Sequence, residues 1–146
     1  CSFCIIPKMR GVMKSRPVAS IVGEAESLVR QGVREINLIA QDMTSYGRDI
    51  GTSLEAMLRE LAKVDGLRWI RIHYCYPWGI TDSLVELIAR EEKILPYIDM
   101  PLQHISERVL KAMDRKTPPD RIREILKRLR EGIDGVVLRT TFIVGF

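Results

Sequence analysis

The sequence has few residues of the kinds that bind zinc. Among its 146 residues are three cysteines and two histidines. Cys1 and Cys4 form a Cys-x-x-Cys pair, but Cys75, His73 and His104 provide no second pair at the spacing of a structural zinc site. An odd number of cysteines with one close pair does not suit a disulfide framework either, so a reducing compartment is expected.

Long apolar runs and targeting signals are also missing. No segment approaches the roughly 20 apolar residues that a membrane-spanning helix needs, and there is no signal-peptide pattern, low-complexity tract or internal repeat. Hydrophobic residues make up 46% of the chain, which is enough for one compact domain with a core, and the length is too short for two. A cytoplasmic globular protein is the expectation.

The Cys-x-x-Cys pair has two further interpretations, a redox dithiol or two thiolate ligands of an iron–sulfur cluster. A dithiol of the thioredoxin type normally lies where a strand meets a helix, whereas Cys4 is followed by the apolar run Ile5-Ile6-Pro7 and then a basic stretch. The cluster is therefore favoured. A zinc ion held across a dimer of a non-catalytic binding protein stays open as an alternative.

Basic residues exceed acidic ones by 23 to 19 and gather in two places. The first group has no acidic residue within it, so it is a candidate for contact with phosphate or RNA, with a solvated loop as the alternative; it comprises Lys8, Arg10, Lys14 and Arg16. The second lies on a predicted helix among acidic residues and is expected to form a salt-bridged outer face; it comprises Arg121, Arg123, Lys127, Arg128 and Arg130, with Asp120, Glu124 and Glu131.

Short β-branched runs alternate with amphipathic stretches along the chain. The periodicity predicts strands at 35–40, 68–74, 95–102 and 136–144, and helices at 18–31, 54–66, from 81 or 82 onward, 106–115 and 118–130. The stretch Thr52-Ser53-Leu54-Glu55 has the form of a capping box at the start of the second helix. Strands separated by whole helices cannot be hairpins, so a parallel sheet is expected.

Such a sheet is either doubly wound or part of a βα barrel. No Gly-x-Gly-x-x-Gly follows the first strands, which disfavours a dinucleotide-binding fold. In a barrel, ligands bind at the carboxyl ends of the strands. Polar residues follow each predicted strand, so several side chains are expected to face one mouth; they include Gln41 and Asp42, residues 73–76, Gln103 and His104, and Arg139 with Thr141.

The Cys-x-Phe-Cys motif, followed by Ile-Ile-Pro and a partial βα (TIM-like) barrel, resembles the radical S-adenosylmethionine (SAM) superfamily, whose signature is Cys-x-x-x-Cys-x-x-Cys. The resemblance implies that Cys1 and Cys4 bind a 4Fe-4S cluster whose third cysteine ligand precedes residue 1, and that the open iron binds SAM. It also implies that residues 1–146 are the front portion of the catalytic barrel, truncated at both ends and inactive alone.

Nearly the whole chain resembles the methylthiotransferase branch of that superfamily. Residues 7–11, 74–77 and especially 100–106 are similar to the enzymes that modify an aspartate of a small-subunit ribosomal protein, whereas the tRNA adenosine methylthiotransferases, the alternative, have Gln-Ser-Gly at 103–105. The resemblance implies a radical that abstracts hydrogen from the β-carbon of the aspartate, and sulfur from a second 4Fe-4S cluster. It places that cluster in an N-terminal domain, and substrate docking in a C-terminal domain, both outside residues 1–146.

The resemblance also assigns roles to individual side chains. Phe3 is expected beside the cluster and the adenine, Gln41 at the methionine amino group, Gln103 at the ribose and Arg139 at the SAM carboxylate. Thr141 and Ile143 fit a Gly-x-Ile-x-Gly-x-x-Glu motif along the adenine, with threonine at the first glycine. Local alternatives remain: core packing for Phe3, a turn cap at 41–42, a strand-end hydrogen bond for Gln103, and a salt bridge to Asp99 for Arg139. His73 and Cys75 are expected to serve packing, and His104 to be structural.

Overall fold

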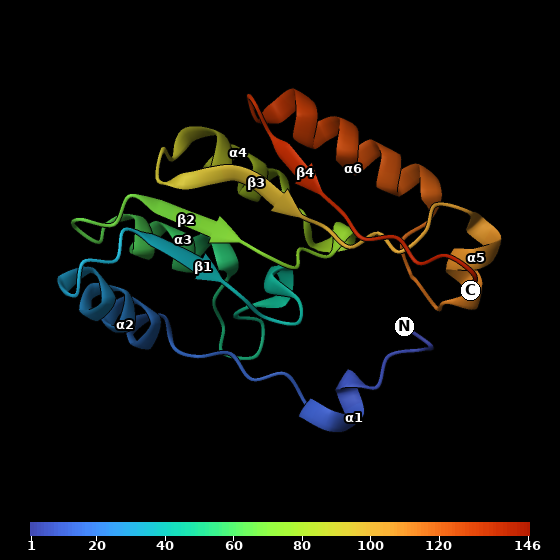
Figure 1. Cartoon of the computed structure of the whole chain (residues 1–146), viewed down its shortest axis with the longest axis horizontal. Coiled ribbons are helices and arrows are strands. Elements are labelled where there is room, and N and C mark those ends of the chain that lie inside the picture. The colour runs from blue at the N-terminus through green and yellow to red at the C-terminus, as the bar shows by residue number, and fades with distance from the viewer.

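Four strands form one parallel sheet in the computed structural model, which describes residues 1–146. The strands follow the order of the chain across the sheet: β1 (Glu35–Leu38), β2 (Trp69–Ile72), β3 (Ile94–Asp99) and β4 (Val137–Arg139). Figure 1 shows the four arrows side by side and pointing the same way. Since helices connect them, the predicted α/β architecture of successive βα units is confirmed.

Six helices accompany the sheet: α1 (Ile6–Arg10), α2 (Val18–Arg30), α3 (Leu54–Ala62), α4 (Asp82–Arg90), α5 (Glu107–Ala112) and α6 (Pro119–Gly132). Two short 3-10 turns, η1 (Met43–Ser45) and η2 (Pro77–Gly79), follow the first two strands. Alternate strand residues such as Ile70, Ile72 and Ile98 are fully buried in a core of 26 residues that the helices complete. No helix is long and apolar enough to cross a membrane.

The strands are shorter than the hydrophobic pattern predicts. Residues 39–40, 73–74, 100–102 and 140–144 lie beyond the last residue of β1, β2, β3 and β4, respectively. Tyr74, two residues after β2, has a φ angle of 57°, which side chains with a Cβ rarely adopt and which takes the chain out of the extended conformation. Gln103, with a φ angle of 71°, forms an isolated parallel bridge with Phe142 beyond the ends of β3 and β4. The basic group at residues 8–16, for which a solvated loop is the alternative interpretation, begins within a helix, because α1 ends at Arg10.

The first turn of α3 differs from the predicted capping box. Ser53, and not Thr52, is the N-cap, because its hydroxyl accepts the amide hydrogen of Ala56. Glu55 instead accepts hydrogen bonds from Thr81 (2.6 Å) and Ser83 (2.9 Å) at the start of α4. The carboxylate thereby joins the first turns of two neighbouring helices.

Replacing Ser53 with alanine is expected to lower the free energy of unfolding by about 1 kcal/mol, because the Ala56 amide loses its only side-chain acceptor. Thr52→Ala is the matched control and is expected to have a smaller effect. Urea unfolding followed by circular dichroism measures both. Equal effects, or a larger effect of Thr52→Ala, would contradict the assignment of the cap.

Four of the five basic residues of α6 form ion pairs with acidic residues, and Arg130 has none. Arg121 with Glu124, Arg123 with Asp120, and Lys127 with Glu131 form ion pairs along the exposed surface of the helix. Arg128 reaches Asp82 at the start of α4, 3.0 Å away. Most of the positive charge of this helix is therefore paired within the chain.

Candidate functional site

The carboxyl ends of the four strands lie at one edge of the sheet, and backbone hydrogen bonds join the segments that follow them. The Met43 amide binds the Tyr74 carbonyl at 3.0 Å, and the Cys75 amide binds the Asp99 carbonyl at 2.8 Å. Gln103 donates its amide to the Thr141 carbonyl and accepts the Ile143 amide, both at 2.8 Å. Three of the predicted site residues, Gln103, Thr141 and Ile143, are thus brought together.

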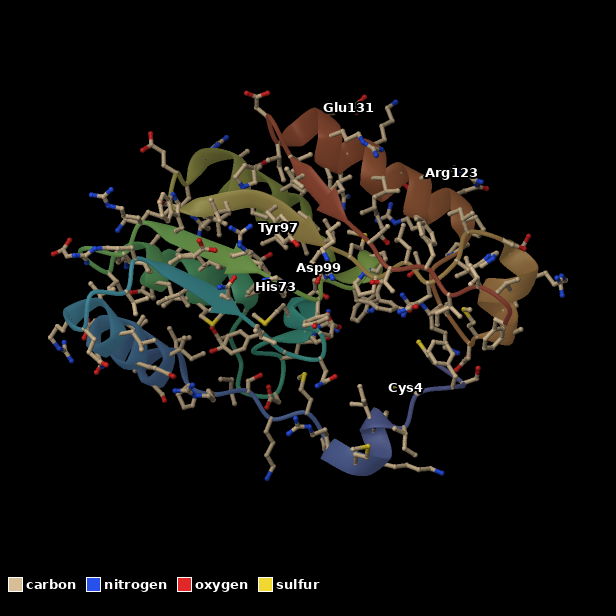
Figure 2. The ribbon with its side chains drawn as sticks, in the orientation of Figure 1. Cys4, His73, Tyr97, Asp99, Arg123 and Glu131 are labelled. Carbon is tan, nitrogen blue, oxygen red and sulfur yellow. The ribbon has the colours of Figure 1, made fainter.

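A buried carboxylate lies on the face of the sheet opposite the helices. Asp99 is 1% exposed, and its Oδ1 accepts a hydrogen bond from Arg139 Nη1 at 3.0 Å. Its Oδ2 has no hydrogen-bond partner; His73 Nδ1 lies 3.6 Å away, and His73 Nε2 lies 3.2 Å from Asn37 Oδ1. Figure 2 shows His73, Tyr97 and Asp99 together in the middle of the sheet. Polar side chains from all four strands or strand ends therefore meet across this face.

Arg139 makes the ion pair with Asp99 that the sequence offers as an alternative role. The bond uses Nη1, and the side chain as a whole is about half exposed, at 55%. The guanidinium carries five N–H donors, so the ion pair orients the group without exhausting it. The role of Arg139 toward the SAM carboxylate stays a prediction.

Gln103 combines a strained backbone with an unsatisfied side chain. Its φ of 71° is held by the two backbone bonds to Thr141 and Ile143. Its Oε1 is buried and has no donor within the chain. A buried amide oxygen without a partner costs stability, so a ligand that donates a hydrogen bond there would recover it.

At the end of β1, Asp42 takes the local role that the sequence offers as an alternative. Its carboxylate caps η1 by accepting from the Thr44 amide at 3.0 Å and the Thr44 hydroxyl at 2.6 Å. Gln41, beside it, is exposed at the same edge. His104 is structural, because its Nδ1 accepts the Ser106 amide at 2.9 Å.

The segment of Cys1 to Cys4 is a turn anchored on α5. The Cys4 amide binds the Cys1 carbonyl at 3.2 Å, and Ser2 binds the carbonyls of Met113 and Ala112 through its amide (2.8 Å) and hydroxyl (3.0 Å). Both cysteines are exposed and unoxidised. Figure 2 shows Cys4 on the N-terminal segment, on the side toward which the strands point.

Phe3, the aromatic residue within the turn, is 46% exposed. Its ring packs edge-on against Phe146 at 5.8 Å between centroids. The N-terminal turn thereby contacts the segment that follows β4, which also carries Thr141 and Ile143. The place of Phe3 near the adenine stays a prediction.

Cys75 differs from the other two cysteines. It is fully buried, and burial, followed by the nearby carboxylates of Asp42 and Asp99, raises the pKa of its thiol to about 12. The group is therefore a neutral thiol at physiological pH and packs as a small apolar side chain, as the sequence predicts.

Iodoacetamide at pH 8 is expected to alkylate Cys1 and Cys4 in the folded, metal-free protein and to leave Cys75 unmodified, because the thiolate is the reactive form. Peptide mass spectrometry locates the modified residues. All three cysteines should react after unfolding in urea. Rapid modification of Cys75 in the folded state would contradict its burial.

The structure contains two neighbouring thiols and no group of three or more His, Cys, Asp or Glu side chains that could hold a metal ion. Two exposed thiolates suit part of the ligand set of an iron–sulfur cluster, for which cysteine is the usual donor. The orphaned Gln103 Oε1 at the neighbouring strand end suits a hydroxyl-bearing ligand. The residues present therefore fit a cluster with an organic cofactor beside it.

Comparison with known families identifies the family of the chain. The Radical SAM superfamily matches residues 1–146, the whole chain. The chain belongs to the radical SAM superfamily. The parallel sheet of βα units is accordingly part of a radical SAM barrel.

Several relatives carry the name ribosomal protein uS12 methylthiotransferase RimO. Those from Geobacter sulfurreducens and Syntrophotalea carbinolica are each 55% identical to the chain over its whole length, and the one from Clostridium botulinum is 51% identical. The chain corresponds to 33%, 32% and 33% of these proteins. It therefore spans about a third of the length of the relatives that it matches.

Proposed function

We propose that residues 1–146 are the front portion of the catalytic barrel of a methylthiotransferase that adds a methylthio group to the β-carbon of an aspartate in ribosomal protein uS12. The observation that carries the proposal is the 55% identity to a RimO protein across every element that forms the site. The N-terminal domain with a second cluster and the C-terminal substrate-docking domain would belong to the remaining two-thirds of such a protein. The full-length protein is a polypeptide that contains this chain and has the length of the RimO relatives.

In this proposal Cys1 and Cys4 hold a 4Fe-4S cluster with a third cysteine that precedes residue 1. When bound, the cluster supplies the electron that cleaves SAM reductively. The anchoring of Ser2 on the last residues of α5 supports the assignment, because it fixes the position of both thiols relative to the carboxyl edge of the sheet.

The residues at that edge would orient SAM. The free Oε1 of Gln103 would accept a ribose hydroxyl, and the guanidinium nitrogens of Arg139 that do not bind Asp99 would receive the carboxylate. Gln41 would meet the amino group. Phe3, Thr141 and Ile143 would line the adenine and exclude water from it.

The basic residues between positions 8 and 16 would face RNA of the small ribosomal subunit that carries uS12. The activity would then take place in the cytoplasm, where ribosomes are. Arg16 is already paired with Glu24, at 2.5 Å, so Lys8, Arg10 and Lys14 are the candidates for phosphate contact. Their positions on and after α1 keep them exposed. Binding through them would weaken as salt concentration rises.

The test is reaction of the reconstituted full-length protein with purified uS12, SAM, a sulfur source and reductant under anaerobic conditions. Methylthiolation of one aspartate of uS12, found by peptide mass spectrometry and absent when that aspartate is replaced by alanine, is expected. A tRNA substrate under the same conditions is the control. Modification of tRNA and not of uS12 would contradict the proposed substrate.

A further inference from the structure

Arg115 connects the cysteine turn to the loop that carries Gln103. Its Nη1 donates to Cys1 Sγ at 3.3 Å, and its Nη2 donates to the Pro101 carbonyl and, at 3.5 Å, to the Leu102 carbonyl. The guanidinium also lies over the ring of Tyr76, 4.4 Å from its centroid. No other side chain of this chain hydrogen-bonds to a thiol of Cys1 or Cys4.

These contacts hold the guanidinium in one place. Arg115 is half-buried, and burial lowers the pKa of its side chain while Tyr76 opposes that shift. It remains a cation at physiological pH. Because Tyr76 and the two carbonyls fix the plane of the guanidinium, its Nη1 presents a directed, charged donor to the sulfur and needs no reorientation.

A charged donor at a ligand sulfur acts on a cluster in two ways. It fixes the direction of the sulfur, as outer-shell partners of metal ligands do, and it stabilises the more negative, reduced form of the cluster. The same guanidinium binds carbonyls one and two residues before Gln103, so it also sets the distance between the cysteine turn and the loop assigned to the SAM ribose.

We propose that Arg115 is a positioning residue that holds the Cys1 thiolate against the Gln103 loop and raises the reduction potential of the cluster bound there. The inference rests on the proposed function for the existence of the cluster. Arg115 lies in the connection between α5 and α6. In this proposal it contributes to the site without binding iron or contacting SAM.

The test compares Arg115→Gln and Arg115→Lys with the parent full-length protein after anaerobic reconstitution with iron and sulfide. Spectroscopic titration against mediator dyes gives the reduction potentials of the two clusters, and the transition that is missing in Cys4→Ala belongs to the cluster held by Cys1 and Cys4. For Arg115→Gln we expect reduction to become at least tenfold less favourable, which is about 59 mV for a one-electron couple. Arg115→Lys keeps the charge but loses the planar fork, so an intermediate shift is expected.

A second readout needs no cluster. In the metal-free protein, hydrogen exchange of the peptide that contains Ser2 to Cys4 should become faster in Arg115→Gln, because the turn loses one of its anchors. Arg123→Gln is the matched control. Arg123 lies on the exposed face of α6, far from Cys4 in Figure 2, and pairs only with Asp120. Neither the potential nor the exchange should change in this control.

The outcomes separate the inference from the proposed function. A folded Arg115→Gln protein with the parental potential and the parental exchange rate would overturn the role of Arg115 and leave the proposed function standing. A parent protein that binds no cluster under these conditions would overturn both. If Arg115→Gln fails to fold, Tyr76→Leu is the second variant, because it removes the ring on which the guanidinium lies. Its cluster is expected to have a lower reduction potential than the parent, as for Arg115→Gln. An unchanged potential would contradict the inference.

Discussion

Replacing Cys4 with alanine in the full-length protein is expected to remove the cluster held by Cys1 and Cys4, so that bound iron and acid-labile sulfide fall to about half, the amount held by the second cluster of the N-terminal domain. Loss of one outer-shell partner typically weakens metal binding by about 10–100-fold, and loss of a ligand should cost more. Cys4 is exposed and no side chain depends on it for packing, so the fold should survive. Iron and sulfide analysis with the visible absorption spectrum measures the effect.

Cys75→Ala is the control for this experiment. Cys75 is buried, with a neutral thiol, and lies in the core and not in the exposed turn. Its replacement should leave the cluster content unchanged at a small cost in stability. Parental iron and sulfide content in Cys4→Ala, or a loss of iron and sulfide in Cys75→Ala, would show that the ligands have been assigned to the wrong cysteines.

Replacing Ile98 with alanine is expected to lower the free energy of unfolding by about 3 kcal/mol, the middle of the range for truncation of a fully buried aliphatic side chain. Ile98 lies in β3 between Ile72 and Leu138 of the neighbouring strands and has no exposed surface. Its loss would leave a cavity beneath the strand that carries Asp99. Chemical unfolding followed by circular dichroism measures the change.

The matched control is Ile39→Ala, the same substitution just after β1, at a side chain that is 69% exposed. We expect a change of about 0.5 kcal/mol or less, as for surface substitutions in general. Comparable losses at both positions would contradict the assignment of the faces of the sheet. The Asp99 carboxylate lies on the opposite face from Ile98, so a selective loss at Ile98 also supports the placement of the polar cluster.

The order and type of the main elements follow from hydrophobic periodicity, because burial against one shared core determines which residues of each strand and helix must be apolar. The ends of the elements do not follow in the same way. Tyr74 and Gln103, which follow β2 and β3, have left-handed φ angles that tyrosine and glutamine do not favour on their own, and their backbones hydrogen-bond to η1 and to the segment after β4. Ser53, and not Thr52, caps α3, and Glu55 binds Thr81 and Ser83 of the α4 start, partners that the local sequence does not reveal.

Some residues of the candidate site can likewise be predicted from the sequence, and others only from the structure. The cysteine pair and the polar residues after the strands are visible in the sequence because their spacing is local. The partner of Arg139 was one of two alternatives, and only the register of β3 with β4 selects Asp99. Arg115 carries no local signal at all, since its contact with Cys1 joins residues that are 114 positions apart.

Formation of 5′-deoxyadenosine from SAM by the reconstituted full-length protein tests the central claim most directly. Production that requires reductant and disappears in Cys4→Ala, while persisting in Cys75→Ala, is the predicted result. A folded protein with a full complement of iron and sulfide that forms no 5′-deoxyadenosine with uS12 present would contradict the account.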